Sequence, residues 1–260
     1  MDARTLSDRE LLELEIETLW KRNGAGRLLR ASLFNDGPAP DLVIAASDGA
    51  ITVAFGPDIP EALAEEITVR GALATRRGLN LAFPRPPRDG TWPALIDDLR
   101  QRLSADLGPV EVASGPSYVC EGVPAGPLAA GLVRSEDVAA DFRRLAPPED
   151  ANWEPWEWEL LLNGKLGPWA AMIAAEEVVS LCFCARLTGT AAEAGLRTEA
   201  DFRRQGYGVA VTAAWASQVL ATGRIAFYST SADNLASQRV AARLGLRPIG
   251  WMWQLSKSRV

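Results

Sequence analysis

The feature that most constrains the fold is a glycine-rich turn between an apolar strand and an apolar helix. Residues 196–208 read Leu-Arg-Thr-Glu-Ala-Asp-Phe-Arg-Arg-Gln-Gly-Tyr-Gly, and a helix is expected from Gly208 to about Leu220. The first amides of a helix lack partners within the helix and lie at the positive end of its dipole. Glycines let an anion approach such amides closely. The segment therefore predicts a pyrophosphate site, with Arg203 and Arg204 adding positive charge beside it.

The spacing of the turn, Arg-x-x-Gly-x-Gly from Arg203 to Gly208, narrows the choice of ligand. It is neither the dinucleotide motif Gly-x-Gly-x-x-Gly nor the triphosphate loop that ends in Gly-Lys-Ser/Thr. It resembles the acetyl-CoA pyrophosphate loop of the GNAT N-acetyltransferase superfamily, and the approach from Leu196 to Arg203 looks like that family's. After a buried strand at 225–230, the sequence Asn-Leu-Ala-Ser-Gln-Arg-Val-Ala-Ala-Arg-Leu-Gly-Leu at 234–246 resembles the family's second CoA-contacting helix.

The resemblance covers about residues 126–260 and implies a GNAT-like catalytic domain there, an α/β (α+β) fold with a mixed sheet. Three strands are expected before the loop, over residues 169–174, 178–186 and 191–198. A Pro- and Gly-rich linker at 121–127 separates this domain from residues 1–122, a smaller mixed α/β domain of unknown role. Two interpretations of the N-terminal domain stay open: a degenerate GNAT-like half, or an unrelated module.

Local signals predict several elements of the N-terminal half. Ser7 and Glu10 fit a capping box that opens a helix, and Leu12 and Ile16 lie on its apolar face. Other expected elements are strands at 42–46, 51–55, 110–113 and 118–120 and helices at 60–74 and 92–105. Further along, a helix is expected near 135–145 and a closing strand at 251–255.

Charge and composition exclude some classes of function. The 260-residue chain has a formal net charge of −6, whereas a nucleic-acid binder usually carries a basic face. No window approaches the roughly 18 consecutive apolar residues of a membrane span, and the polar start lacks a signal-peptide core. We therefore expect a cytoplasmic monomer or homodimer without nucleic-acid or membrane partners. The acidic balance suits a cationic small molecule, such as an amine.

The chain has no histidine and three cysteines, Cys120, Cys182 and Cys184. His-based triads, His general bases and His metal ligands are thereby excluded. Three sparse cysteines indicate no disulfide framework, and Cys182 and Cys184 read as buried core thiols. We expect no metal, so acid–base chemistry falls to carboxylates, Tyr, Lys, Cys, water or the substrate.

The resemblance implies a set of residues that bind the cosubstrate, acetyl-CoA. The pyrophosphate would rest on the loop, formed by Arg203, Arg204, Gln205, Gly206, Tyr207 and Gly208. The pantetheine arm would pair like an added strand with main-chain groups of Leu196, Arg197 and Thr198. A backbone N–H of that strand would stabilise the thioester oxygen, and Asn234 and Ser237 would hydrogen bond to CoA. Asn234 also fits an ordinary helix cap, and the two roles are compatible.

Proton handling departs from the family's pattern. Many members carry a Tyr seven residues after the Asn of the second helix, to protonate the leaving thiolate, and that position is Ala241 here. Tyr228, on the preceding strand, is a candidate replacement, the alternative being a core Tyr. Glu193 is the candidate base, but counting back from Arg203 leaves it one residue from the family's usual place. Because one residue reverses the face of a strand, this role needs a bulge.

Alternating Trp and Glu residues at 153–159 lie where GNAT folds usually build the acceptor site. Trp153, Glu154, Trp156 and Glu157 could form a cage for a cationic amine, the alternative being a helix that packs its Trp residues and solvates its Glu residues. Three hypotheses follow for the whole protein. The first is an N-acetyltransferase acting on a small amine, the second a non-catalytic acyl-CoA-binding or sensing protein, and the third an interaction scaffold.

Overall fold

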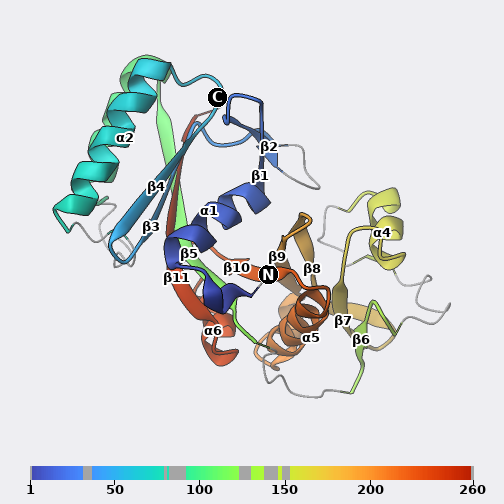
Figure 1. The fold of residues 1–260 in the computed structure, drawn as a ribbon. Coiled ribbons are helices and arrows are strands. Elements are labelled where there is room, and N and C mark those ends of the chain that lie inside the picture. The colour runs from blue at the N-terminus through green and yellow to red at the C-terminus, as the bar shows by residue number, and fades with distance from the viewer. Residues whose placement is uncertain are drawn as a thin grey trace. The chain divides into compact units, whose positions relative to one another are not determined.

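The computed structural model describes residues 2–31, 37–78, 81, 92–122, 130–137, 146–147 and 153–258. They form two compact units that do not follow the order of the chain (Figure 1). One unit is built mainly from Val119–Tyr228 and Ala236–Arg247, and the other from Arg4–Tyr118, Ser229–Leu235 and the residues from Pro248 onward. Most of the expected linker and most of the helix expected near 135–145 fall outside the described residues. The domain boundary therefore stays a prediction.

The unit that holds most of the N-terminal residues contains four neighbouring strands in the order β4-β3-β11-β5. Their bounds are Leu42–Ser47 for β3, Ala50–Phe55 for β4, Val110–Cys120 for β5 and Arg247–Lys257 for β11. β3 pairs antiparallel with β4 on one side and with β11 on the other. A strand from the end of the chain therefore lies between two strands from its first half.

Three helices belong to the same unit: α1 (Asp8–Leu19), α2 (Glu61–Arg76) and α3 (Ala94–Leu107). The predicted capping box is confirmed, since the Ser7 side chain accepts from the Glu10 amide and the Glu10 carboxylate from the Ser7 amide. The helix ends at Leu19 because the next residues form a hairpin of β1 (Trp20–Arg22) and β2 (Leu28–Ala31), which the sequence did not predict.

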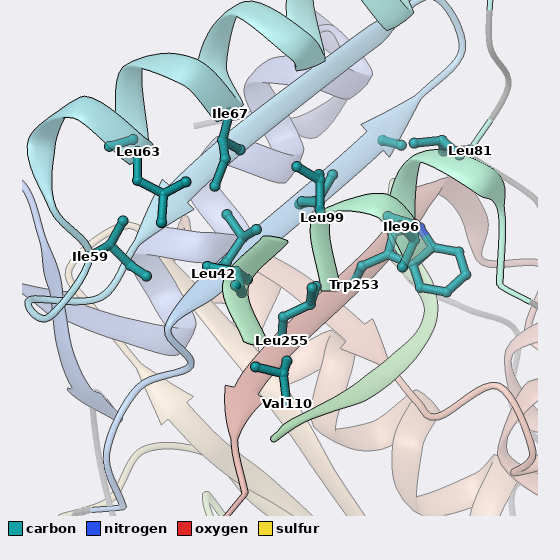
Figure 2. Packing of buried hydrophobic residues seen from close by; sticks show 14 of the residues in the cluster. Leu42, Ile59, Leu63, Ile67, Leu81, Ile96, Leu99, Val110, Trp253 and Leu255 are labelled. Atoms are coloured by element: carbon teal, nitrogen blue, oxygen red, sulfur yellow. The ribbon is translucent and has the colours of Figure 1, made fainter. Parts of the chain in front are cut away.

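The core of this unit joins α2 and α3 to the sheet (Figure 2). Leu63 and Ile67 lie one turn apart on α2, and Leu99 lies on α3, so each helix presents an apolar stripe. These stripes pack with Leu42 of β3 and Trp253 of β11, both 0% exposed. Complete burial of such side chains stabilises the fold by about 1.5–3 kcal/mol each.

The prediction of two short strands at 110–113 and 118–120 is wrong, because β5 runs unbroken through Gly115 and Pro116. Gly115 does not break the strand; its missing side chain leaves room for a neighbouring segment of backbone. A Cβ at this position would lie 1.7 Å from the carbonyl oxygen of Thr230. The segment from Ser229 to Leu235 hydrogen bonds to β5 at the same place, through the amides of Thr230 and Ala232. Glycine therefore permits the close approach of two backbones.

This contact predicts a large stability effect at Gly115. We expect Gly115→Ala to lower the free energy of unfolding by about 3 kcal/mol, the upper range for forcing atoms into a packed interior. Gly122→Ala is the matched control, because a Cβ there meets nothing within 4 Å and its φ is not positive. Urea denaturation of both variants measures the difference. Equal stability of the two would contradict the contact at Thr230.

The other unit, built mainly from Val119–Tyr228 and Ala236–Arg247, has strands in the order β10-β9-β8-β7-β6. Its strands are β6 (Leu132–Arg134), β7 (Trp169–Ala174), β8 (Glu177–Leu187), β9 (Ala191–Thr198) and β10 (Ile225–Ser229). The three strands expected before the loop are thus confirmed. β6 to β9 pair antiparallel, whereas β9 and β10 are parallel, so the sheet is mixed, as predicted. The helices are α4 (Pro155–Leu162), α5 (Tyr207–Ala221) and α6 (Leu235–Arg243), and a short turn of 3-10 helix, Ala200–Phe202, precedes the loop.

α5 packs on β7, β8 and β9 and is apolar almost throughout because most of it is buried. The Trp215 indole N–H donates to Cys184 Sγ at 3.4 Å, which places this thiol on the face of the sheet that α5 covers. Burial raises the pKa of Cys184 to about 11, so the thiol is neutral at physiological pH. Cys182 is likewise buried, which confirms the prediction of core thiols.

Candidate functional site

α5 begins at a glycine in the left-handed conformation. Gly206 is the N-cap residue, with φ 86° and ψ −1°, and a Cβ on it would meet nothing within 4 Å. No side chain in the described part of the chain caps this helix. The first-turn amides, beginning with Tyr207 and Gly208, therefore lie at the positive end of the helix dipole without a capping side chain from the described residues. The arrangement can hold an anion without moving any side chain.

The loop before α5 is tied to the end of β9. The Arg203 Nε donates to the Thr198 carbonyl at 3.2 Å, and the Gln205 side chain donates to the Asp201 carbonyl at 3.3 Å. Arg203, Arg204 and Gln205 are all exposed. The structure therefore brings the predicted loop residues together at one helix terminus, with both guanidinium groups on its solvent side.

β9 and β10 are paired over only part of their length. The parallel ladder joins Ala191, Ala192 and Glu193 to β10, although β9 continues to Thr198. On its other edge, β9 stays paired with β8 as far as Thr198. An edge where the neighbouring ladder stops early is where an extended ligand can add as a strand. Leu196, Arg197 and Thr198 lie in this part of β9.

The start of α5 adjoins both β9 and α6. A Cβ on Gly208 would lie 3.4 Å from Thr198 Oγ1, 3.6 Å from a Leu196 methyl and 3.7 Å from a Val240 methyl. These are ordinary contact distances, so the glycine leaves a small gap between the loop and the two elements. The predicted phosphate loop and the predicted pantetheine strand are therefore neighbours.

Tyr228 and Ser237, two predicted site residues, contact each other. The hydroxyl of Tyr228, on β10, lies 2.6 Å from Ser237 Oγ, on α6. Tyr228 is 3% exposed and Ala241 is completely buried. Asn234 is exposed and directly precedes α6, within the compact unit that holds Ser229–Leu235.

Glu193 lies on the face of the sheet opposite α5. It is 4% exposed and pairs with Phe227 of β10 and Arg186 of β8. β9 alternates regularly, so Glu193 shares its face with Gly195, while Ala194 lies opposite Cys184 on the α5 side. The bulge that would bring Glu193 back to the expected face of β9 does not occur, because the extra residue at this point is Ala185 of β8 and β9 itself has none.

Aromatic side chains cover the neighbouring part of that face. Phe183 pairs with Gly195, and a Cβ on the glycine would lie 2.6 Å from the Phe183 ring. Trp153 packs against Phe183 with ring centroids 5.0 Å apart, and Trp158 packs against Trp153 at 5.8 Å. The structure thus places Trp153 on the same side of the sheet as Glu193. Phe183 and Arg186 were missed because only the strand register shows what they face.

The other predicted acceptor residues lie at the start of α4. Glu154 and Glu157 form a capping box, in which each side chain accepts from the backbone N–H of the other. Trp156 is 57% exposed. Two carboxylates of the expected cation cage therefore already have helix-capping partners, and their contact with an acceptor stays a prediction.

Within the described ranges, no three His, Cys, Asp or Glu side chains are grouped so that they could hold a metal ion. In the same part of the chain, no helix combines the length and apolar character that crossing a bilayer requires.

Comparison with known proteins gives one family match. Residues 150–250 match the family model described as GNAT acetyltransferase. No curated protein matches the chain. Among solved structures, a GCN5-related N-acetyltransferase from Kribbella flavida is 16% identical, with a TM-score of 0.48 and coverage of 98% of this chain and 96% of that one. A tandem GNAT protein from the clavulanic acid biosynthesis pathway is 15% identical, with a TM-score of 0.44 and coverages of 96% and 95%.

A GNAT-family structure from Novosphingobium aromaticivorans is 18% identical, with a TM-score of 0.44. It covers 57% of this chain, which spans 66% of that structure's length. All three structural similarities are loose. The match over residues 150–250 is the more specific finding, and it includes β9, the loop and α5.

Proposed function

We propose that this protein, whose residues 150–250 match the GNAT acetyltransferase family model, is an acetyl-CoA-dependent N-acetyltransferase for a small amine. One observation carries the proposal. α5 starts at the left-handed Gly206, beside the part of β9 that its parallel neighbour no longer pairs. This gives an anion site and an open strand edge in direct succession, as a phosphate-bearing extended cosubstrate requires.

The residues present fit the pyrophosphate and the pantetheine arm of acetyl-CoA. The uncapped amides after Gly206 and the exposed Arg203 and Arg204 favour negative charge. Leu196, Arg197 and Thr198 offer main-chain groups along β9, and Ser237 offers a hydroxyl nearby on α6. Acetyl-CoA supplies the activated thioester, so the protein's tasks are to position it, to stabilise charge and to move protons.

Proton removal is assigned to Glu193. A primary amine is mostly protonated at neutral pH and must lose a proton before it attacks. Glu193 lies on the face that carries Trp153 and Phe183, so an amine approaching it passes aromatic rings, which attract cations. A thiol with a pKa of about 8.5 gives a thiolate that is a good leaving group, so a proton donor such as Tyr228 assists without being essential.

The test is an amine-dependent assay for release of the CoA thiol. The full chain is mixed with acetyl-CoA and a panel of primary amines, each paired with the alcohol of the same carbon skeleton. We expect thiol release with some amines, an equal amount of N-acetylated product by mass spectrometry, and none with the paired alcohols. Binding of acetyl-CoA without amine-dependent release would favour the alternative of a non-catalytic acyl-CoA-binding protein, which the absent donor at Ala241 motivates.

The aromatic cluster makes a separate prediction about the acceptor. Trp153→Leu removes a ring that rests on Phe183, and we expect the KM of the amine to rise about tenfold while the KM of acetyl-CoA stays the same. Trp156→Leu is the matched comparison, because this Trp lies in the same segment but is 57% exposed, and its effect should be smaller. Steady-state kinetics with each substrate varied in turn measures both. An equal rise in the two KM values would contradict an acceptor role.

A further inference from the structure

The bulge in β8 changes which side chain faces Glu193. From Ser180 to Cys184 the strand pairs residue by residue with β9, and a regular continuation would place Ala185 opposite Glu193. The register shifts there by one residue, and Arg186 takes that position instead. Bulges next to active sites often re-aim a side chain in this way. Without the extra residue, Glu193 would face a methyl group and not a guanidinium.

The burial of Glu193 gives this pairing a chemical consequence. Glu193 is only 4% exposed. Burial favours the protonated form of a carboxyl group over the charged carboxylate. A protonated carboxyl cannot accept the proton of an incoming amine. A buried general base therefore needs a nearby positive charge to stay ionised at physiological pH.

Arg186 is the cation that the surrounding elements supply. Burial lowers the pKa of Arg186 and its interaction with the Glu193 carboxylate raises it, so the two charges act on each other. Cys182, on the other face of β8, is neutral, because burial raises its pKa well above the usual value.

On the face that carries Glu193, the neighbouring strand residues Phe183 and Phe227 are uncharged. The carboxylates of Glu154 and Glu157, in the segment that packs there through Trp153, cap α4. α5 covers the opposite face and contributes no charged side chain.

The backbone of the bulge also fixes the guanidinium. Arg186 Nη1 donates to the carbonyl of Ala185, the extra residue, at 2.6 Å. The same irregularity thus turns Arg186 toward Glu193 and holds one of its nitrogens.

We propose that Arg186 is a positioning residue that holds Glu193 ionised and oriented as the general base. The proposal rests on the proposed function, because it takes Glu193 to be the base of an amine acetyltransferase. It assigns a role to a residue that the motif around the phosphate loop does not include.

The first test measures the pKa of the Glu193 carboxyl group directly, in the absence of acetyl-CoA and acceptor. Carbon-detected NMR of protein labelled at the Glu side-chain carboxyl follows Glu193, assigned by the loss of its signal in Glu193→Gln. We expect Arg186→Gln to raise the pKa of Glu193 by about one unit or more, because a nearby opposite charge lowers a carboxyl pKa by roughly 1–3 units. Arg186→Lys keeps the charge on a different head group and should raise it less.

The second test uses the pH dependence of kcat/KM with one amine throughout, so that the amine's own ionisation is common to all variants. Removing the cation raises the pKa of the base, so less of it is ionised at low pH. Arg186→Gln should therefore lose about tenfold in activity below both pKa values and recover at higher pH, where the base is ionised again. Damage to the fold alone would lower kcat/KM at every pH.

The outcomes separate this inference from the proposed function. An unchanged Glu193 pKa in folded Arg186→Gln overturns the positioning role, whatever the activity. A raised pKa together with full activity of Glu193→Gln would instead support the electrostatic interaction of Arg186 with Glu193 and remove Glu193 from the mechanism. Arg186→Gln is checked for folding by circular dichroism, and if it does not fold it is set aside. A further variant without the charge, Arg186→Met, then replaces Arg186→Gln in both tests, and an unchanged Glu193 pKa in folded Arg186→Met overturns the positioning role.

Discussion

Replacing Gly206 with Asp should abolish CoA binding. Gly206 starts α5 in the left-handed conformation, with open space where a side chain would grow. A carboxylate placed there would share the amides and the positive helix end that we assign to the pyrophosphate. Two like charges about 4 Å apart near a protein surface repel by about 4 kcal/mol. We therefore expect the affinity for CoA, measured by calorimetry, to fall by about 10²-fold or more.

Gly206→Asn is the matched control for this experiment. Asn is nearly the same size as Asp, is uncharged and tolerates the left-handed conformation better than most residues. It should keep most of the affinity for CoA and the same thermal stability as the Asp variant. Equal affinities of the two variants would show that charge at this position is irrelevant, and the pyrophosphate would then have to bind elsewhere.

The second large effect is expected at Glu193. If this carboxylate removes the proton of the amine, directly or through an ordered water, then kcat/KM rises with pH as Glu193 and the amine lose their protons. Glu193→Gln should lower the plateau by about 10²-fold, the lower end of the range for general-base catalysis. The KM of acetyl-CoA should change little, because Glu193 lies on the face that carries Trp153 and Phe183, which we assign to the acceptor and not to CoA.

A second carboxamide substitution provides the control. Glu177→Gln makes the same chemical change at the exposed start of β8 and should leave the plateau intact. A full plateau in Glu193→Gln, combined with a large loss in Tyr228→Phe, would move the proton-handling role to the Tyr228–Ser237 hydroxyl pair.

Local signals predicted those parts of the fold that local chemistry determines. The capping box at Ser7, the strands β3 and β4 and the helix after Gly206 are each specified by residues close together in the chain. The long strands β5 and β11 were underestimated because Gly115 and Pro248 suggest breaks. What overrides those signals is long-range pairing, which is a property of distant segments and is not encoded in any local window.

The same distinction applies to the candidate site. The loop that we propose for the pyrophosphate is one continuous segment, so its residues could be named from sequence spacing and a family resemblance. The face around Glu193 could not be predicted in this way, since Phe183 and Arg186 reach it only through the register of β8 against β9. The segment from Trp153 shows an intermediate result. The sequence predicted a cluster of aromatic residues there, but it did not show that Glu154 and Glu157 cap the helix that follows.

The place of β11 also has a consequence for synthesis on the ribosome. This strand lies between β3 and β5. The four strands β4-β3-β11-β5 therefore cannot form a continuous sheet until residues 247–257 have emerged. Until then, β3 can pair only with β4, and the edge it will later offer to β11 is open. Unpaired strand edges of this kind promote aggregation. A nascent chain of this protein therefore carries an open edge on β3 until residues 247–257 have followed and inserted as β11.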